Sequence, residues 1–210
     1  PPTVSPVSGL PVYYRMALLD KANYSYSNTT GFISAVDATF SVYEECREDG
    51  YNVMNILLQS KTGLQSTFQT EPYLSNKMHH FWIAYYGPSR SLNVYIDGVS
   101  AKLFSEDGFP VPVSLNTSSL VKFHINASAV GYGSLIRNNG GLIDEIVFSN
   151  QFIVDSNILS KVINYGVEHA IDQSLLYKEF VNECFVFDDP TSLGVTSVLS
   201  NGKNFYAGRN

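Results

Sequence analysis

The stretch HHFWIAYYGPSRSLNVYIDGVSAKLF, residues 79–104, decides the fold of this chain. Apolar side chains stand at every second position from Leu92 to Ile96, which is the period of a strand with one buried face. Asp97 and Gly98 follow, and an Asp-Gly pair between two alternating runs predicts a type I′ hairpin turn, because both central residues of that turn need positive φ. The earlier run HFWIAYY is almost wholly apolar and predicts a strand that is buried on both faces.

Similar patterns continue on both sides of this stretch. Residues 12–78 hold short runs rich in Val, Ile, Tyr and Phe, with Asp49-Gly50 as a second hairpin signal. Alternation returns at 121–126, and a run of Asn and Gly at 138–141 precedes a further strand. Many short strands between turn residues predict an all-β fold in which two antiparallel sheets form a sandwich.

The pattern becomes helical after this region. Asp155 or Ser156 suits a helix N-cap, apolar residues follow at helical spacing, and Gly166 stands where a first helix would end. A second stretch of helical spacing follows Gly166. We therefore expect one or two short helices within about 155–182.

Length and composition indicate a single domain. A sandwich of 210 residues still forms one core. The opening residues, rich in Pro, Ser and Gly, predict an extended arm or linker over 1–12. The rest of the chain, 13–210, is expected to be one domain whose last strands lie at about 184–208.

Charge excludes several classes of partner. The formal net charge is −6 and the sequence has no Lys/Arg cluster, so neither nucleic acid nor an anionic membrane surface is an expected partner. No apolar run approaches the roughly 18 residues that a membrane span needs, and no membrane insertion is expected. Charged residues are only 15% of the chain, while Ser, Asn and Tyr are abundant. Such a surface is typical of adhesion modules and virion proteins.

Sequence motifs for catalysis are missing. The chain has no P-loop, dinucleotide fingerprint or nucleophile elbow. A glycosidase needs two carboxylates about 5–10 Å apart, whereas the adjacent acidic pairs of this chain diverge if they lie on strands. Carboxylates from different strands could still converge, which a sequence does not reveal. We expect no enzymatic activity.

His79, His80 and two cysteines have mainly structural interpretations. Adjacent residues on a strand point apart, so His80 is predicted to pack beside Trp82 while His79 points outward. Cys46 and Cys184 match no zinc motif. They are either two small buried residues or a pair that links an early strand to a late one.

Three segments resemble the laminin-G-like, concanavalin A-like family. They are HHFWIAYYGPSRSLNVYIDG (79–98), the late strand pair AVGYGSLIRNNGGLIDEIVFSN (129–150) and the short helix DSNILSKVINYG (155–166). The resemblance implies a jelly-roll sandwich. It also implies a fold that carries glycan-binding modules and glycan-active enzymes, often with one calcium ion at the rim.

Candidate site residues follow from this chemistry. Aromatic rings stack on sugars while polar groups read the hydroxyls, and the glycan-binding candidates near predicted strands and loops are Tyr85, Tyr86, Tyr95, Tyr132, Arg137 and Asn138. Calcium prefers oxygen ligands, and the loop carboxylates that could supply them are Asp107, Asp188 and Asp189. The alternative for these carboxylates is a solvated role in turns. No other cofactor is expected.

We therefore expect a non-catalytic structural or adhesion module, carried by a virion as a decoration or fibre protein or located on a cell surface. Its partners would be other protein subunits and carbohydrate, and its location the virion or the extracellular space. Two alternatives stay open: a glycoside hydrolase or lyase on the same fold, and a calcium-dependent lectin.

Overall fold

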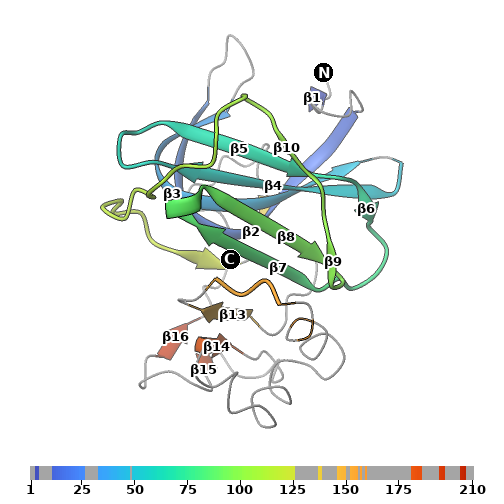
Figure 1. Cartoon of the computed structure of the whole chain (residues 1–210). Coiled ribbons are helices and arrows are strands. Elements are labelled where there is room, and N and C mark those ends of the chain that lie inside the picture. The colour runs from blue at the N-terminus through green and yellow to red at the C-terminus, as the bar shows by residue number, and fades with distance from the viewer. Residues whose placement is uncertain are drawn as a thin grey trace.

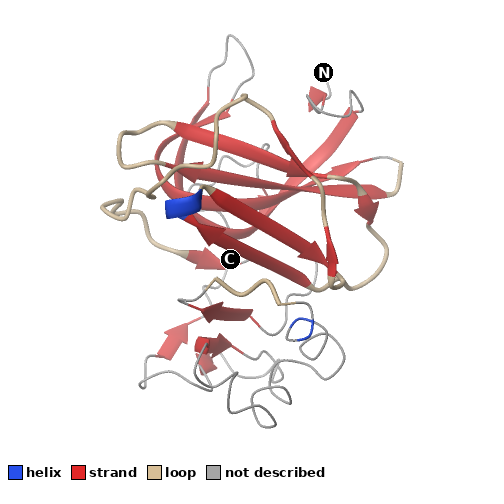
Figure 2. Cartoon of the chain, viewed as in Figure 1, coloured by secondary structure: helices blue, strands red, loops and turns tan. Residues whose placement is uncertain are grey.

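The computed structural model describes residues 3–4, 11–26, 33–47, 49–125, 137–138, 146–149, 152–155, 157, 159, 181–185, 194–196 and 204–206. Within these residues the bounded elements are sixteen strands and one short 3-10 helix, η1 (Gly87–Ser89). Figure 2 shows how strongly strands dominate. This confirms the all-β prediction.

The larger sheet has nine strands. Its main order is β1 (Thr3–Val4), β2 (Pro11–Tyr26), β3 (Ile33–Arg47), β4 (Tyr51–Gln59), β5 (Gln65–Thr70) and β10 (Leu103–Ser105). Off this path, β6 (Tyr73–Leu74) pairs with β4, while β11 (His124–Ile125) and β12 (Arg137–Asn138) pair with β2. Every pairing is antiparallel except that of β12 with β2. Register shifts between β2 and β3 mark bulges, which bend these long strands.

Three smaller sheets accompany it. The strands β7 (Phe81–Tyr86), β8 (Ser91–Ile96) and β9 (Val99–Ser100) form a three-stranded antiparallel sheet. Two further pairs are β13 (Ile146–Ser149) with β14 (Val181–Phe185), and β15 (Gly194–Thr196) with β16 (Asn204–Tyr206). In Figure 1 these two pairs occupy the lower part of the view.

The main core lies between the nine-stranded and three-stranded sheets (Figure 1). Val42, Met54, Ile56 and Phe68 stand at alternate positions of β3, β4 and β5 and pack with Val94 of β8. The alternation predicted around Leu92–Ile96 is therefore confirmed, because one face of β8 enters this core. The residues between these positions on β3, β4 and β5 lie on the opposite face of the nine-stranded sheet, which points away from this core.

The predicted Asp97-Gly98 turn is confirmed. Asp97 has φ 53° and Gly98 has φ 79°, so both central residues have the positive φ that a type I′ turn requires. The turn joins β8 to β9, whose pairing runs Ile96 with Val99 and Tyr95 with Ser100.

The burial predicted for HFWIAYY is wrong in part. The strand forms as β7, but only Ala84 is fully buried and the other residues are half-buried or exposed. The reason is that β7 is an edge strand of its small sheet, hydrogen-bonded to β8 alone.

Residues 109–116 join the two sheets. Ser66 of β5 donates its hydroxyl to the carbonyl of Pro110 at 2.9 Å, and Tyr85 of β7 donates to that of Pro112 at 2.8 Å. Gly87 is required at this contact, since a Cβ there would lie 1.9 Å from the carbonyl oxygen of Val113.

The start of the predicted helical region has the expected cap. The Asp155 carboxylate accepts the N–H of Asn157 at 2.7 Å, and its carbonyl accepts the N–H of Leu159 at 3.1 Å. Most of the remaining region predicted as helical lies outside the described residues. The last two positions of that region, 181 and 182, belong to β14, so they are strand. No helix in the described part of the chain is long and apolar enough to cross a membrane.

Candidate ligand-binding site

A row of polar side chains crosses the face of the nine-stranded sheet that points away from the main core. Register places them together: Arg15 of β2 pairs with Glu45 of β3, Tyr43 of β3 pairs with Asn55 of β4, and Asn55 pairs with Gln69 of β5. Glu106 follows β10, which pairs with β5. We call these six residues the Glu45 cluster: Arg15, Tyr43, Glu45, Asn55, Gln69 and Glu106.

Gln69 is the centre of this cluster. Its Nε2 lies 3.2 Å from Oε2 of Glu45, 3.1 Å from Oδ1 of Asn55 and 3.4 Å from Oε1 of Glu106. Two carboxylates that are 61 positions apart in sequence therefore share one amide nitrogen. Asn55, by contrast, keeps a buried Nδ2 without a hydrogen-bond partner, so the cluster has one unused donor.

Glu45 is held as an ion pair. Its side chain is 0% exposed, and Nε and Nη2 of Arg15 donate to its Oε1 at 2.9 and 2.7 Å. The Arg15 guanidinium also lies over the Tyr43 ring, 5.6 Å from its centroid. Both oxygens of Glu45 are thus occupied, by Arg15 and by Gln69.

Glu106 has the opposite electrostatic environment. Burial, together with the nearby negative charge of Glu45, raises the pKa of Glu106 to about 7. Glu106 therefore gains or loses its proton near neutral pH. Burial likewise raises the pKa of the neighbouring Tyr43 phenol well above its ordinary value.

Arg47 lies on the same face, two residues beyond Glu45 at the end of β3. Its side chain is 5% exposed. Nη2 donates to Oδ2 of Asp49 in the β3–β4 turn, and this hydrogen bond lowers the pKa of the Asp49 carboxyl. Nε and Nη1 of Arg47 are buried and have no hydrogen-bond partner among the described residues.

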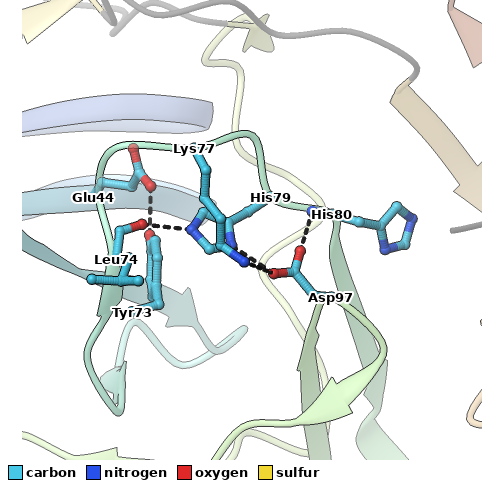
Figure 3. Close-up of polar contacts among 7 residues, drawn as sticks. All are labelled: Glu44, Tyr73, Leu74, Lys77, His79, His80 and Asp97. Atoms are coloured by element: carbon cyan, nitrogen blue, oxygen red, sulfur yellow. Dashed lines mark hydrogen bonds and ion pairs between the residues drawn. The ribbon is translucent and has the colours of Figure 1, made fainter.

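A second polar group, at one end of the sandwich, has a structural role (Figure 3). The Asp97 carboxylate accepts the N–H of His80 and Nζ of Lys77, both at 3.0 Å, and lies 2.9 Å from Nδ1 of His79. Burial opposes ionisation of Asp97, but these three donors outweigh it and lower its pKa. They tie residues 77–80 to the β8–β9 turn.

The outward position predicted for His79 is wrong. Its side chain is only 6% exposed, Nε2 lies 2.5 Å from the carbonyl oxygen of Leu74, and the ring packs 5.1 Å from that of Tyr73. The cause is that β7 begins at Phe81, so strand alternation does not extend to His79.

Among the glycan-binding candidates, the structure describes the side chains of Tyr85, Tyr86 and Tyr95, which have three different environments. Tyr85 uses its hydroxyl on Pro112, Tyr86 is exposed beside Phe152, and Tyr95 is half-buried on β8. Arg137 and Asn138 form β12, on β2, and their side chains lie outside the description, as does all of Tyr132. None of the six candidates is a member of the Glu45 cluster.

Of the calcium candidates, Asp107 occupies a turn. Its Oδ2 accepts the N–H of Thr67 at 2.9 Å and its Oδ1 that of Phe109 at 3.0 Å. Asp188 and Asp189 lie outside the described residues. Over the side chains that are described, no group of three or more His, Cys, Asp or Glu could hold a metal ion.

Cys46 is a buried cysteine of β3. This burial agrees with the first interpretation of Cys46, a small buried residue, and does not test the second, a pair with Cys184. Cys184 lies in β14, with its side chain outside the description.

The Glu45 cluster was not among the sequence candidates. Alternation along β3 identifies Tyr43 and Glu45 as one face, but only the strand order brings Gln69 and Glu106 to them. The one signal of this cluster in the sequence is that polar residues alternate with apolar residues along these strands. Comparison with protein-family models, with curated proteins and with solved structures finds no match for this chain.

Proposed function

We propose that the chain is a non-catalytic binding module that recognises a carbohydrate through the Glu45 cluster. The observation that carries this proposal is a set of groups on one sheet face: the half-buried Glu106, with the buried Tyr43 ring and the buried Asn55 amide, whose Nδ2 has no hydrogen-bond partner among the described residues, beside it. Sugar sites combine aromatic rings with precisely placed hydrogen-bonding groups.

A glycan-active enzyme is the second candidate, and one observation favours it. Glu45 and Glu106 both contact Nε2 of Gln69, which brings two carboxylates close together, and glycosidases use a pair of carboxylates. A carboxyl with a pKa of about 7, as in Glu106, also suits a general acid.

The state of Glu45 favours binding over catalysis. A nucleophile or general base needs a free oxygen that faces the substrate or its water. Both oxygens of Glu45 accept hydrogen bonds and its side chain is fully buried. Glu45 therefore acts as an anchor for Arg15 and Gln69.

A binding and turnover experiment tests the proposal. The wild-type chain and Glu106→Gln would be applied to an oligosaccharide array, and every bound sugar would then be incubated with each protein and its products separated. We expect both proteins to bind the sugar and neither to release a product. Glu106→Gln should still bind, since Gln has the shape of Glu and keeps a side-chain oxygen that accepts hydrogen bonds. Product that disappears in Glu106→Gln would establish the enzyme instead, and an array without any bound sugar would refute the binding module.

We further propose that the module belongs to a surface assembly, either a virion or a cell surface, where other protein subunits are its partners. Support comes from the low charge and the polar, Tyr-rich composition. The finer fold proposal is a concanavalin A-like jelly roll, and its support is the two packed antiparallel sheets together with the three segments quoted above.

A further inference from the structure

Arg47 has hydrogen-bonding capacity that the protein does not use. A guanidinium group carries five N–H donors and stays charged at all ordinary pH values. One nitrogen of Arg47 donates to Asp49, whereas Nε and Nη1 are buried without a partner. A buried charge with unpaired donors is costly, so such a group indicates a site for an anionic acceptor.

The position of Arg47 connects this anion site to the Glu45 cluster. Arg47, Glu45 and Tyr43 occupy alternate positions of β3 and share its outer face. At about 3.4 Å per residue, the backbone positions of Arg47 and Tyr43 are roughly 14 Å apart. A ligand that contacts both Arg47 and Tyr43 must be an extended molecule. Its negative charge would lie at Arg47 and its hydroxyl groups near Tyr43.

We infer that Arg47 binds the carboxylate of an acidic sugar, so that the ligand of this sheet face is an oligosaccharide containing hexuronate. The inference rests on the proposed function, because the Glu45 cluster supplies the contacts to the neutral part of the ligand. A planar carboxylate matches the two parallel N–H groups at the end of a guanidinium.

Asp49 is the internal competitor of such a ligand. Its carboxylate is 38% exposed, lies in the β3–β4 turn and occupies Nη2 of Arg47. A sugar carboxylate that displaces Asp49 gains Nη2 together with the unpaired Nη1, which completes a two-bond contact. Removing the charge of Asp49 should therefore strengthen binding of the acidic ligand, whereas removing the Arg47 guanidinium should weaken it.

The probes are hexuronate oligosaccharides and the same oligosaccharides with each carboxylate reduced to an alcohol. Affinities would be measured by calorimetry at fixed ionic strength for the wild type and the variants Arg47→Gln, Arg47→Lys and Asp49→Asn. Asn at position 49 retains a side-chain oxygen for the N–H of Tyr51, which Asp49 accepts at 3.1 Å. Arg90→Gln is the matched control, since Arg90 is exposed and lies outside this face.

We expect the wild type to bind a hexuronate oligosaccharide at least tenfold more tightly than its reduced form. Arg47→Gln should abolish this preference, Arg47→Lys should retain part of it, and Asp49→Asn should raise the affinity for the acidic form severalfold. Because Asp49→Asn predicts a gain, misfolding cannot imitate the result. Equal affinity for both forms, a preference that survives Arg47→Gln, or no binding of either form would overturn the inference. The binding module itself would be refuted only by an oligosaccharide array without any bound sugar.

Discussion

The carboxyl of Glu106 makes the stability of the protein depend on pH. Its pKa of about 7 in the folded chain lies above the unfolded value near 4.5. The folded state therefore holds the Glu106 proton more tightly, and the free energy of unfolding decreases as the pH rises from about 4.5 to 7. We expect Glu106→Gln to remove this decrease, a change of the order of 1 kcal/mol after allowance for solvent screening. Urea unfolding at pH 5 and pH 8 measures it, with the exposed Glu71→Gln as control. A slope equal to that of the wild type in Glu106→Gln would contradict the assignment.

At the same scale, Glu45 depends on Arg15 for its charge compensation. Arg15→Met removes both donors to Oε1 and leaves a buried carboxylate without its cation. Loss of one partner of a buried ion pair costs about 3–5 kcal/mol, whereas removal of both charges is much milder. Denaturant unfolding of Arg15→Met and of Arg15→Met with Glu45→Gln measures the two costs. The double variant should be the more stable one, and a double variant as unstable as Arg15→Met would show that the pair is not coupled.

At the scale of elements, the β8–β9 turn carries a strict backbone requirement. Gly98 has φ 79°, and Gly98→Val places a β-branched residue in that conformation. The expected cost is about 1–3 kcal/mol, measured as a lower melting temperature. Gly98→Asn is the matched control, because Asn tolerates positive φ and should cost less. Equal losses in both variants would point to steric contacts of the added side chain and not to the backbone conformation at position 98.

The same elements show what a sequence can and cannot predict. Asp97-Gly98 and the alternation of β8 are local signals, so the hairpin was predictable from residues 92–100 alone. The buried position of His79 was not, since it depends on where β7 begins. The meeting of Glu45 with Glu106 depends on the order of β3, β4, β5 and β10, and strand order is a non-local property.

At the scale of the whole molecule, Trp82 connects the sandwich to residues 152–155. Its Nε1 donates to the carbonyl of Ile153 at 2.8 Å, across 71 positions of sequence. Trp82→Phe leaves that carbonyl without its donor, at a cost of about 1–3 kcal/mol. Hydrogen exchange should become faster around Ile153 in this variant. Tyr86→Phe, which keeps the ring beside Phe152, should leave the exchange unchanged, and unaltered exchange in Trp82→Phe would contradict the connection.

The burial of Cys46 lets chemical modification of its side chain report on openings of the large sheet. The residue is buried on β3, with β2 and β4 hydrogen-bonded on either side, so an alkylating reagent meets its sulfur only during the intervals when the sheet is open. The variant Cys184→Ser restricts labelling to Cys46. In this variant the rate of modification measures how often the sheet opens under native conditions. At low reagent concentration that rate follows the open population, and at high concentration it reaches the opening rate itself. A side chain without any proposed role in recognition thus records how often the centre of the large sheet separates.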